Sequence, residues 1–249
     1  MKVLKKLGEK LSFFKRIKKS TWISIGTNLI LAICIFSAFN MCFKVDAKIV
    51  SSTGYSAIYR GNEQNKNASL MINVYWGTEY IEPMLKVLKD KNVKTTFFVG
   101  GYWVAQNEEL LSKIVEDGHE IANHGYYHKD QGNFGLERNL EEIKMNHTLV
   151  KQTCGVEMNL FAPPSGSYNS STLQAAEKLG YKTIMWSKDT IDWRDKNADL
   201  IFSRATKNMQ NGDLILMHPT KCTFEALEKI IDAYQNAGFT LTTVSQTIA

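Results

Sequence analysis

From residue 69 onward, short apolar runs alternate with stretches of helical periodicity, and this alternation constrains the fold more than any other feature of the sequence. The run at 69–74 is followed by apolar residues at helical spacing over 81–88, and the run at 94–99 by a similar stretch over 110–115. Glycines stand at the expected helix ends, as at Gly118. Repeated βα units of this kind predict an α/β fold with a parallel sheet, open or closed into a barrel.

The same alternation continues to the end of the chain, so the whole region from residue 69 reads as one domain. The expected strands cover residues 69–74, 94–99, 120–122, 159–161, 183–186, 214–217 and 240–244, and the later expected helices cover 171–179, 199–209 and 223–237.

The net charge of +5 is concentrated at the N-terminus of the 249-residue chain. Residues 1–21 hold eight of the 30 basic residues and only one of the 25 acidic ones, which leaves the remainder slightly acidic. A nucleic-acid-binding protein would need a basic surface on the folded domain itself. We therefore expect no nucleic-acid partner.

An uncharged stretch, residues 22–43, follows this basic tail. As a helix it would extend about 33 Å, enough to cross a bilayer. The flanking cations favour a signal anchor with the tail in the cytoplasm and the C-terminal part outside. A cleaved signal peptide is the alternative, although the apolar core of such peptides is usually shorter. The predicted organisation is a basic cytoplasmic tail (1–21), a transmembrane helix (22–43), a linker with a short strand (44–68) and a catalytic-type domain (69–249).

Chemically active side chains follow three of the expected strands. His124 and His128 come after the third strand and are four residues apart, a spacing that allows both imidazoles to bind one metal ion. His218 directly follows the strand at 214–217 and could protonate a leaving group. Either Asp189 or Asp192 could hold its imidazole. Because parallel strands end at one edge of a sheet, these residues are expected to share one site.

Four motifs in this order resemble those of the polysaccharide deacetylases, metal-dependent enzymes that remove acetyl groups from N-acetylated sugar polymers. The motifs are Gly118–His128, Phe161–Gly166, Asp189–Trp193 and Leu216–His218, and the resemblance covers about residues 56–249. It implies a distorted (β/α) barrel of about seven parallel βα units. It also implies a divalent metal, which His124 and His128 would hold. Two imidazole ligands suit zinc, although cobalt, nickel or iron would also fit. The phrase Asn73-Val74-Tyr75-Trp76-Gly77 further resembles the sporulation-associated, membrane-anchored branch of the family.

The sequence departs from the family at the catalytic base. Members that are active carry two adjacent aspartates after the first strand, one as base and one as metal ligand. One register places Asn73 and Val74 there, with Asn73 as the lost base, and the other places Tyr75 and Trp76 there. Neither pair offers a carboxylate. The arginine that accompanies the base in the family is replaced by Ala162.

Three functional hypotheses follow. The leading one is a membrane-anchored deacetylase-like hydrolase that acts on cell-wall glycan, with weak or impaired turnover and a metal that is weakly bound or absent. The alternative is a glycan-binding or scaffolding pseudoenzyme at the cell wall or spore envelope. A third is a hydrolase of another acyl substrate that uses Glu79 as its carboxylate. The residues expected to contact glycan are Trp193, Trp76, Pro163, Pro164 and Tyr127.

Overall fold

The structure of the chain is a computed structural model that describes residues 21, 24, 27–31 and 54–249. By its internal contacts the chain divides into two units, of which the second, the compact unit Thr53–Ala249, contains every strand described below.

Among the helices of the described residues, none is both long and apolar enough to cross a membrane. The basic tail expected at residues 1–21 and the anchor expected at 22–43 lie almost entirely outside the described residues, as does the first part of the linker. The short strand expected within that linker is present, and it pairs with the sheet of the compact unit.

Nine strands, all parallel where they pair, form one sheet in the compact unit. The order along the sheet is β1-β6-β5-β4-β3-β2-β8-β7, with β9 paired to the start of β2. The strands are β1 (Ala57–Ile58), β2 (Asn67–Val74), β3 (Thr96–Val99), β4 (Glu120–Asn123), β5 (Leu160–Phe161), β6 (Lys182–Ile184), β7 (Lys188–Asp189), β8 (Asp213–Met217) and β9 (Thr240–Leu241).

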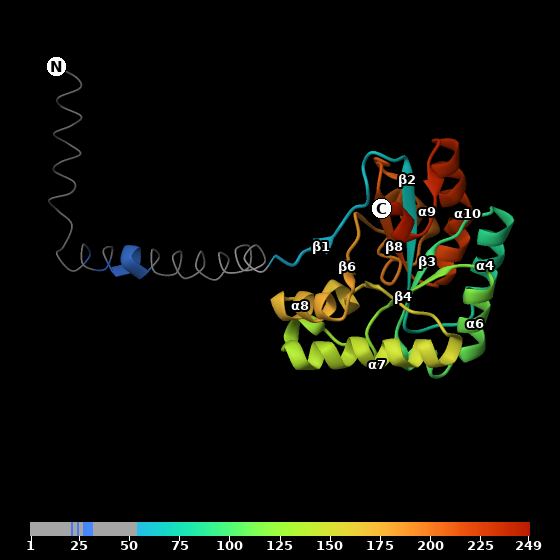
Figure 1. The fold of residues 1–249 in the computed structure, drawn as a ribbon. Coiled ribbons are helices and arrows are strands. Elements are labelled where there is room, and N and C mark those ends of the chain that lie inside the picture. The colour runs from blue at the N-terminus through green and yellow to red at the C-terminus, as the bar shows by residue number, and fades with distance from the viewer. Residues whose placement is uncertain (1–20, 22–23, 25–26, 32–53) are drawn as a thin grey trace, which may run out of the picture. The chain divides into compact units, whose positions relative to one another are not determined.

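Helices follow most of the strands, as the alternation in the sequence predicts, and Figure 1 shows the larger ones around the outside of the strands. They are α4 (Ile81–Asp90), α5 (Gly101–Val104), α6 (Glu108–Glu116), α7 (Leu136–Cys154), α8 (Ser170–Lys178), α9 (Ala198–Thr206), α10 (Lys221–Asn236) and α11 (Val244–Thr247), with single 3₁₀ turns η2 (Gln131–Asn133) and η3 (Pro164–Gly166).

The sheet curls into an incomplete barrel because residues 182–189 pair with strands near both ends of the sheet. The first half of residues 182–189 forms β6, which pairs with β5 and β1. The second half forms β7, which pairs with β8, and between them the Ser187 amide donates to the carbonyl of Leu214. The expectation of a parallel α/β barrel-like fold is thus confirmed at the level of a curled parallel sheet.

The central strand β2 separates two hydrophobic clusters. Leu70, Ile72 and Val74 belong to an outer cluster that the helices cover, and Met71 belongs to a smaller inner cluster inside the curl. This division follows from the alternation of side chains along a strand. The inner cluster consists of Met71, Phe98, Ala122, Leu160, Ala162, Ile184, Leu214 and Val244.

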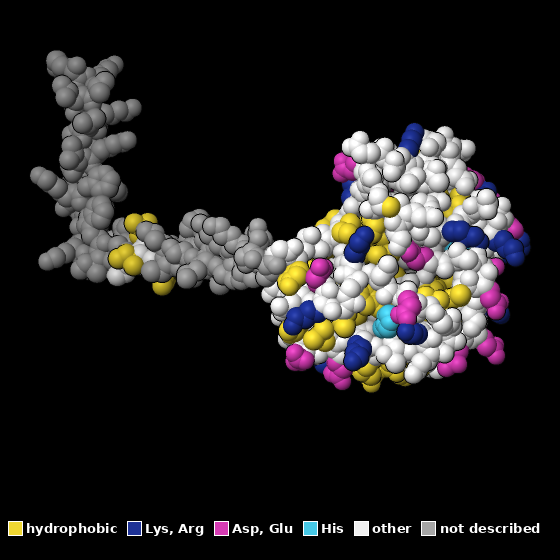
Figure 2. All heavy atoms as spheres, viewed as in Figure 1, with side chains coloured by type: hydrophobic (Ala, Val, Ile, Leu, Met, Phe, Trp, Pro, Cys, Tyr) yellow, Lys and Arg dark blue, Asp and Glu magenta, His cyan; other side chains and the backbone are white. Residues whose placement is uncertain are grey.

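Two parts of the fold differ from the sequence prediction. The strand expected at 240–244 ends at Leu241, and Val244 instead begins α11, whose N-cap is the Thr243 side chain that accepts from the Gln246 amide. The strand β7 was not predicted, because two residues with the charges of Lys188 and Asp189 show no apolar run. Over the face seen in Figure 2, acidic and basic side chains are interspersed.

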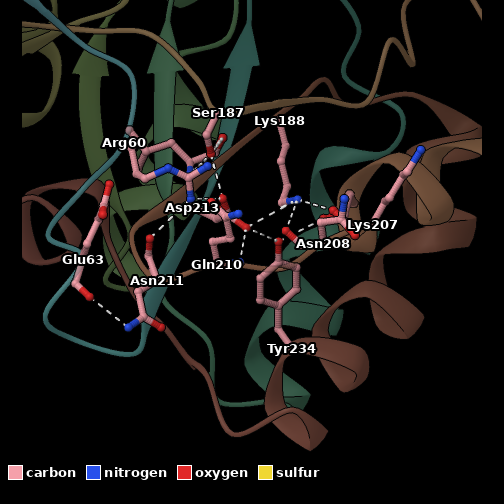
Figure 3. A network of polar contacts seen from close by, with 12 residues as sticks. Arg60, Glu63, Ser187, Lys188, Lys207, Asn208, Gln210, Asn211, Asp213 and Tyr234 are labelled. Atoms are coloured by element: carbon pink, nitrogen blue, oxygen red, sulfur yellow. Dashed lines mark hydrogen bonds and ion pairs between the residues drawn. The ribbon is translucent and has the colours of Figure 1, made fainter.

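A buried carboxylate joins four segments at the start of β8 (Figure 3). Asp213 is fully buried, and its oxygens accept from the Arg60 guanidinium at 2.5 Å, the Ser187 hydroxyl at 3.0 Å and the Tyr234 hydroxyl at 3.2 Å. The Lys188 ammonium lies 3.5 Å away. These partners come from the segment after β1, the β6–β7 stretch and α10, so one side chain holds the edges of the curled sheet together.

We predict that Asp213→Ala lowers the free energy of unfolding by about 3–5 kcal/mol, because it removes the buried partner of an ion pair and leaves the partly buried cations Arg60 and Lys188 without their counter-charge. Urea unfolding followed by circular dichroism measures this change. The matched control is Asp90→Ala, which removes an exposed ion pair with Lys86 on α4 and should cost no more than about 0.5 kcal/mol. Equal losses in the two variants would contradict the assigned role of Asp213.

Candidate active site

A cavity of about 360 Å³ opens at the carboxyl ends of the strands. Because all strands of a parallel sheet end at one edge, side chains from distant parts of the sequence meet there. The residues that line the cavity are Asn73, Tyr75, His124, His128, Ser165, Gly166, Trp186, Asp189, Trp193, Leu216 and His218.

Side chains at the carboxyl end of β2 point alternately into the cavity and into the outer core. Asn73 and Tyr75 line the cavity, whereas Val74 between them is fully buried in the outer cluster beside Ile72. A side chain in that cluster cannot reach an ion in the cavity. The register that gives Val74 the place of the second aspartate is therefore wrong, and Tyr75 and Trp76 are the residues that follow the strand at the cavity.

Asn73 stands in the cavity wall with 3% of its surface exposed. Its side-chain nitrogen lies 3.5 Å from Nε2 of His124, and its buried Oδ1 has no hydrogen-bond partner. A carboxamide does not accept a proton at neutral pH, so Asn73 cannot act as a general base.

His124 is held as a neutral imidazole with one free lone pair. Its Nδ1 lies 2.8 Å from the carbonyl oxygen of Ala162, which can only accept, so Nδ1 carries the proton and Nε2 does not. Burial lowers the pKa of His124 well below its usual value, and the neighbouring His128 lowers it further. A neutral imidazole with its second nitrogen fixed by a carbonyl is the form that binds a metal ion.

The ring of His128 lies beside that of His124, with 5.1 Å between the ring centres. Burial lowers the pKa of His128 to about 4, and the neighbouring His218 lowers it further. The ring of Tyr75 stacks on His128, with 3.3 Å between centres and 15° between planes. The backbone of His128 is left-handed, with φ of 52°, which places it at the end of a tightly bent loop.

The loop between these two histidines depends on a residue that the sequence did not single out. Glu142 on α7 is fully buried, and its Oε2 accepts from the backbone amides of Tyr126 at 3.1 Å and Tyr127 at 2.9 Å. Its Oε1 accepts from Arg138 at 2.7 Å. A glutamate beside the apolar stripe of a helix resembles an ordinary surface residue, so no sequence signal marks it.

On another wall of the cavity, His218 forms a buried pair with an aspartate. Nδ1 of His218 lies 2.7 Å from Oδ1 of Asp192, and Oδ2 of Asp192 accepts from the His218 amide at 2.6 Å and from the Thr223 hydroxyl. The carboxylate fixes the proton on Nδ1, which leaves Nε2 to exchange a proton with a ligand. Of the two aspartates considered from the sequence, Asp192 is therefore the partner, while Asp189 lines the cavity and accepts from the Ile191 amide.

Aromatic side chains stand around the cavity. Trp193 lines it and is 54% exposed, and the Trp76 ring lies 5.0 Å from the ring of His218. Tyr127 is exposed on the loop between His124 and His128. Flat apolar faces that remain accessible to solvent are suited to stacking on sugar rings.

The remaining sequence candidates lie outside the cavity lining. Pro163 and Pro164 are buried and shape the turn that presents Ser165 and Gly166 to the cavity. Glu79 is exposed, its carboxylate accepts from the Thr78 amide, and hydrogen bonds from the local backbone lower its pKa. No contact connects Glu79 with the histidines, so nothing in its position supports a hydrolase that uses it as the base.

The arrangement of donors in the cavity fits a divalent ion held by two imidazoles. Two imidazoles on one tetrahedral ion, each at a metal–nitrogen distance of about 2.0–2.1 Å, have ring centres roughly 5 Å apart, close to the spacing of His124 and His128. Within residues 54–249, no three His, Cys, Asp or Glu side chains are grouped to hold an ion. A third protein ligand for such an ion would therefore be a side chain of another type.

The chain is similar in sequence to polysaccharide deacetylases and to an uncharacterised bacterial protein. The sequence model of the polysaccharide deacetylases matches residues 60–184. YlxY of Bacillus subtilis, an uncharacterised protein, is 41% identical over 76% of this chain and 59% of its own length. This chain thus spans about three fifths of that relative. A Bacillus cereus protein named peptidoglycan-N-acetylglucosamine deacetylase is 31% identical over 67% of this chain and 81% of its own length.

Similarity to solved structures extends over the same region. The crystal structure of a CE4 family pseudoenzyme from Bacillus anthracis has a TM-score of 0.77 and 32% identity, and the match covers 79% of this chain and 70% of that chain. A mutant of that pseudoenzyme, described as having restored enzymatic activity, has the same TM-score. The similar proteins therefore include a protein named as a deacetylase and a pseudoenzyme.

We predict that Glu142→Ala lowers the free energy of unfolding by about 1.5–3 kcal/mol, because two backbone amides lose the buried carboxylate that accepts their hydrogen bonds. Hydrogen exchange at the Tyr126 and Tyr127 amides should accelerate by at least about tenfold. Glu141→Ala is the matched control, since Glu141 also accepts from Arg138 but is exposed. Unchanged exchange at both tyrosines in Glu142→Ala would show that the loop is held by other contacts.

Proposed function

Because the chain belongs to the polysaccharide deacetylase family, we propose that its domain is a deacetylase-like hydrolase of amide C–N bonds in N-acetylated cell-wall glycan, with impaired turnover. The relative named as a peptidoglycan-N-acetylglucosamine deacetylase supports this class of substrate. The similar pseudoenzyme supports the impairment.

One observation carries the proposal: His218, which is hydrogen-bonded to Asp192 behind it, lines the same cavity as the two neutral imidazoles His124 and His128. His124 and His128 are the residues that would hold the divalent ion of the family. When bound, such an ion, zinc for example, supplies polarisation of the acetamide carbonyl and increased acidity of water.

The acid side of the reaction is complete in this chain. Asp192 fixes the tautomer and the orientation of the His218 ring through the hydrogen bond at Nδ1, as the partner of a catalytic histidine does. Nε2 of His218 would then donate its proton to the departing amine nitrogen of the sugar. Trp193 would orient the ring through its exposed face.

The base side is missing. Tyr75 lines the cavity directly after β2, where a carboxylate would be needed, and burial together with the charge of Asp192 raises its pKa. Tyr75 therefore stays protonated at neutral pH and accepts no proton. The loss of a general base typically costs about 100-fold to 10,000-fold in rate. The alternative, a pseudoenzyme that only binds glycan, would result if the remaining turnover were negligible.

We predict that the triple variant Tyr75→Asp, Trp76→Asp and Ala162→Arg releases acetate from N-acetylglucosamine oligomers at least about 100-fold faster than the native protein. The variant supplies a base, a carboxylate ligand and the cation that pairs with the base. Acetate is measured by an enzyme-coupled assay with added Zn²⁺. Tyr102→Asp, which introduces a carboxylate at an exposed tyrosine on α5, is the matched control and should leave the native rate unchanged.

Adding His218→Gln to the triple variant should remove most of the gain, because the leaving nitrogen loses its acid. A native rate equal to that of the triple variant would mean that the base lies elsewhere. A triple variant that is folded, binds metal and is inert would favour the glycan-binding alternative.

We further propose that the domain lies outside the cytoplasmic membrane, at the cell wall or spore envelope, and that residues 22–43 anchor it. The basic tail and the uncharged stretch of the sequence support this topology. So does the resemblance of the Asn73–Gly77 phrase to the sporulation-associated branch of the family.

We predict that the full-length chain fractionates with membranes in a Gram-positive host and resists extraction by alkaline carbonate. Deletion of residues 22–43 should leave the protein in the cytosol. Recovery of the domain from the culture medium, with an N-terminus near Lys48, would identify the segment as a cleaved signal peptide instead.

A further inference from the structure

The contact between Asn73 and His124 is a poor hydrogen bond. The Asn73 side-chain nitrogen and Nε2 of His124 are 3.5 Å apart, whereas N–H donors normally lie about 2.7–3.2 Å from their acceptor. Oδ1 of the same amide is buried and has no partner. A buried carboxamide with one weak contact and one unpartnered atom is costly unless a further group completes it.

The same spacing is appropriate for two ligands of one ion. Donor atoms that each lie about 2.0–2.2 Å from a tetrahedral metal ion are separated by roughly 3.3–3.6 Å. Rotation of the Asn73 amide by half a turn about its last bond exchanges oxygen and nitrogen, and brings Oδ1 to the position 3.5 Å from Nε2. The rotation sacrifices little, because Oδ1 has no hydrogen bond where it lies.

The charge distribution around Nε2 of His124 also favours a cation at this point. Nε2 of His124 is unprotonated because Nδ1 donates to the Ala162 carbonyl. An amide oxygen placed beside it would repel it unless a cation lay between the two. His128 provides a second imidazole at the spacing that one ion requires. A cation at this point would therefore satisfy all three side chains together.

We propose that Asn73 is the third protein ligand of a divalent metal ion held by His124 and His128, through its side-chain carbonyl oxygen. The inference rests on the proposed function and deepens it, since it concerns the same cavity and takes an amide ligand from β2 itself, where Tyr75 and Trp76 offer no carboxylate. The donor set is neutral, so the ion keeps its full charge and is held more weakly than it would be with a carboxylate ligand.

The test is metal affinity, measured by calorimetry with Zn²⁺ and by the visible spectrum of Co²⁺, on the full chain in detergent. The native protein should bind one ion, and His124→Gln with His128→Gln should abolish binding. Even outer partners of a metal site change affinity by about 10–100-fold, so Asn73→Leu should weaken binding at least about tenfold. Asn73→Asp, which adds a negative charge to the same position, should tighten it by a similar factor.

Asn65, an exposed asparagine, provides matched controls: Asn65→Leu and Asn65→Asp should leave the affinity unchanged. Native affinity in a folded Asn73→Leu would overturn the proposal while leaving the histidine site intact. If Asn73→Leu fails to fold, Asn73→Asp decides, and unchanged affinity there also overturns it. Absence of binding by the native protein overturns it too. Acetate release is measured separately, so failure of this proposal is distinguishable from failure of the proposed function.

Discussion

The strict alternation of side chains along β2, at the centre of a parallel sheet, is the constraint on which the rest of the structure depends. Pairing with β3 and β8 on its two sides fixes which face of β2 the helices cover and which lies inside the curl. Val74 must then face the outer core, and Asn73 and Tyr75 must face the cavity. Which side chains at the carboxyl end of β2 can reach the cavity is therefore decided by which face of the strand the helices cover.

The resulting cavity holds the histidines to which we assign acid catalysis and metal binding, but no carboxylate at the end of β2 that could act as a base. The buried pair His218–Asp192 and the carbonyl-fixed imidazole of His124 have the contacts that acid catalysis and metal binding require. Where a base is needed, Tyr75 stacks on His128. The stacked tyrosine presents an aromatic ring to the cavity and offers no carboxylate that could take up a proton. The proposed impairment would therefore have a local cause, the lack of a carboxylate at the end of β2.

Much of the fold was predictable because it depends on local patterns. Apolar runs and helical spacing located the main strands and helices, and the strand ends brought His124, His128 and His218 to one edge. What escaped prediction depends on contacts between distant residues. The register at Val74 required knowledge of which face of β2 is covered. The partnership of Arg60 with Asp213 joins residues 153 positions apart, and Glu142 is distinguished from surface glutamates only by its burial.

The central claim is that this cavity binds N-acetylated glycan but lacks the base to hydrolyse it efficiently. A calorimetric titration of the native protein with an N-acetylglucosamine oligomer, and with the same oligomer after deacetylation, tests it most directly when acetate is measured in the same samples. The account predicts binding of the acetylated oligomer in preference to the deacetylated one, with little acetate formed during the titration. Rapid acetate release, or no binding of either oligomer by the folded protein, would contradict it.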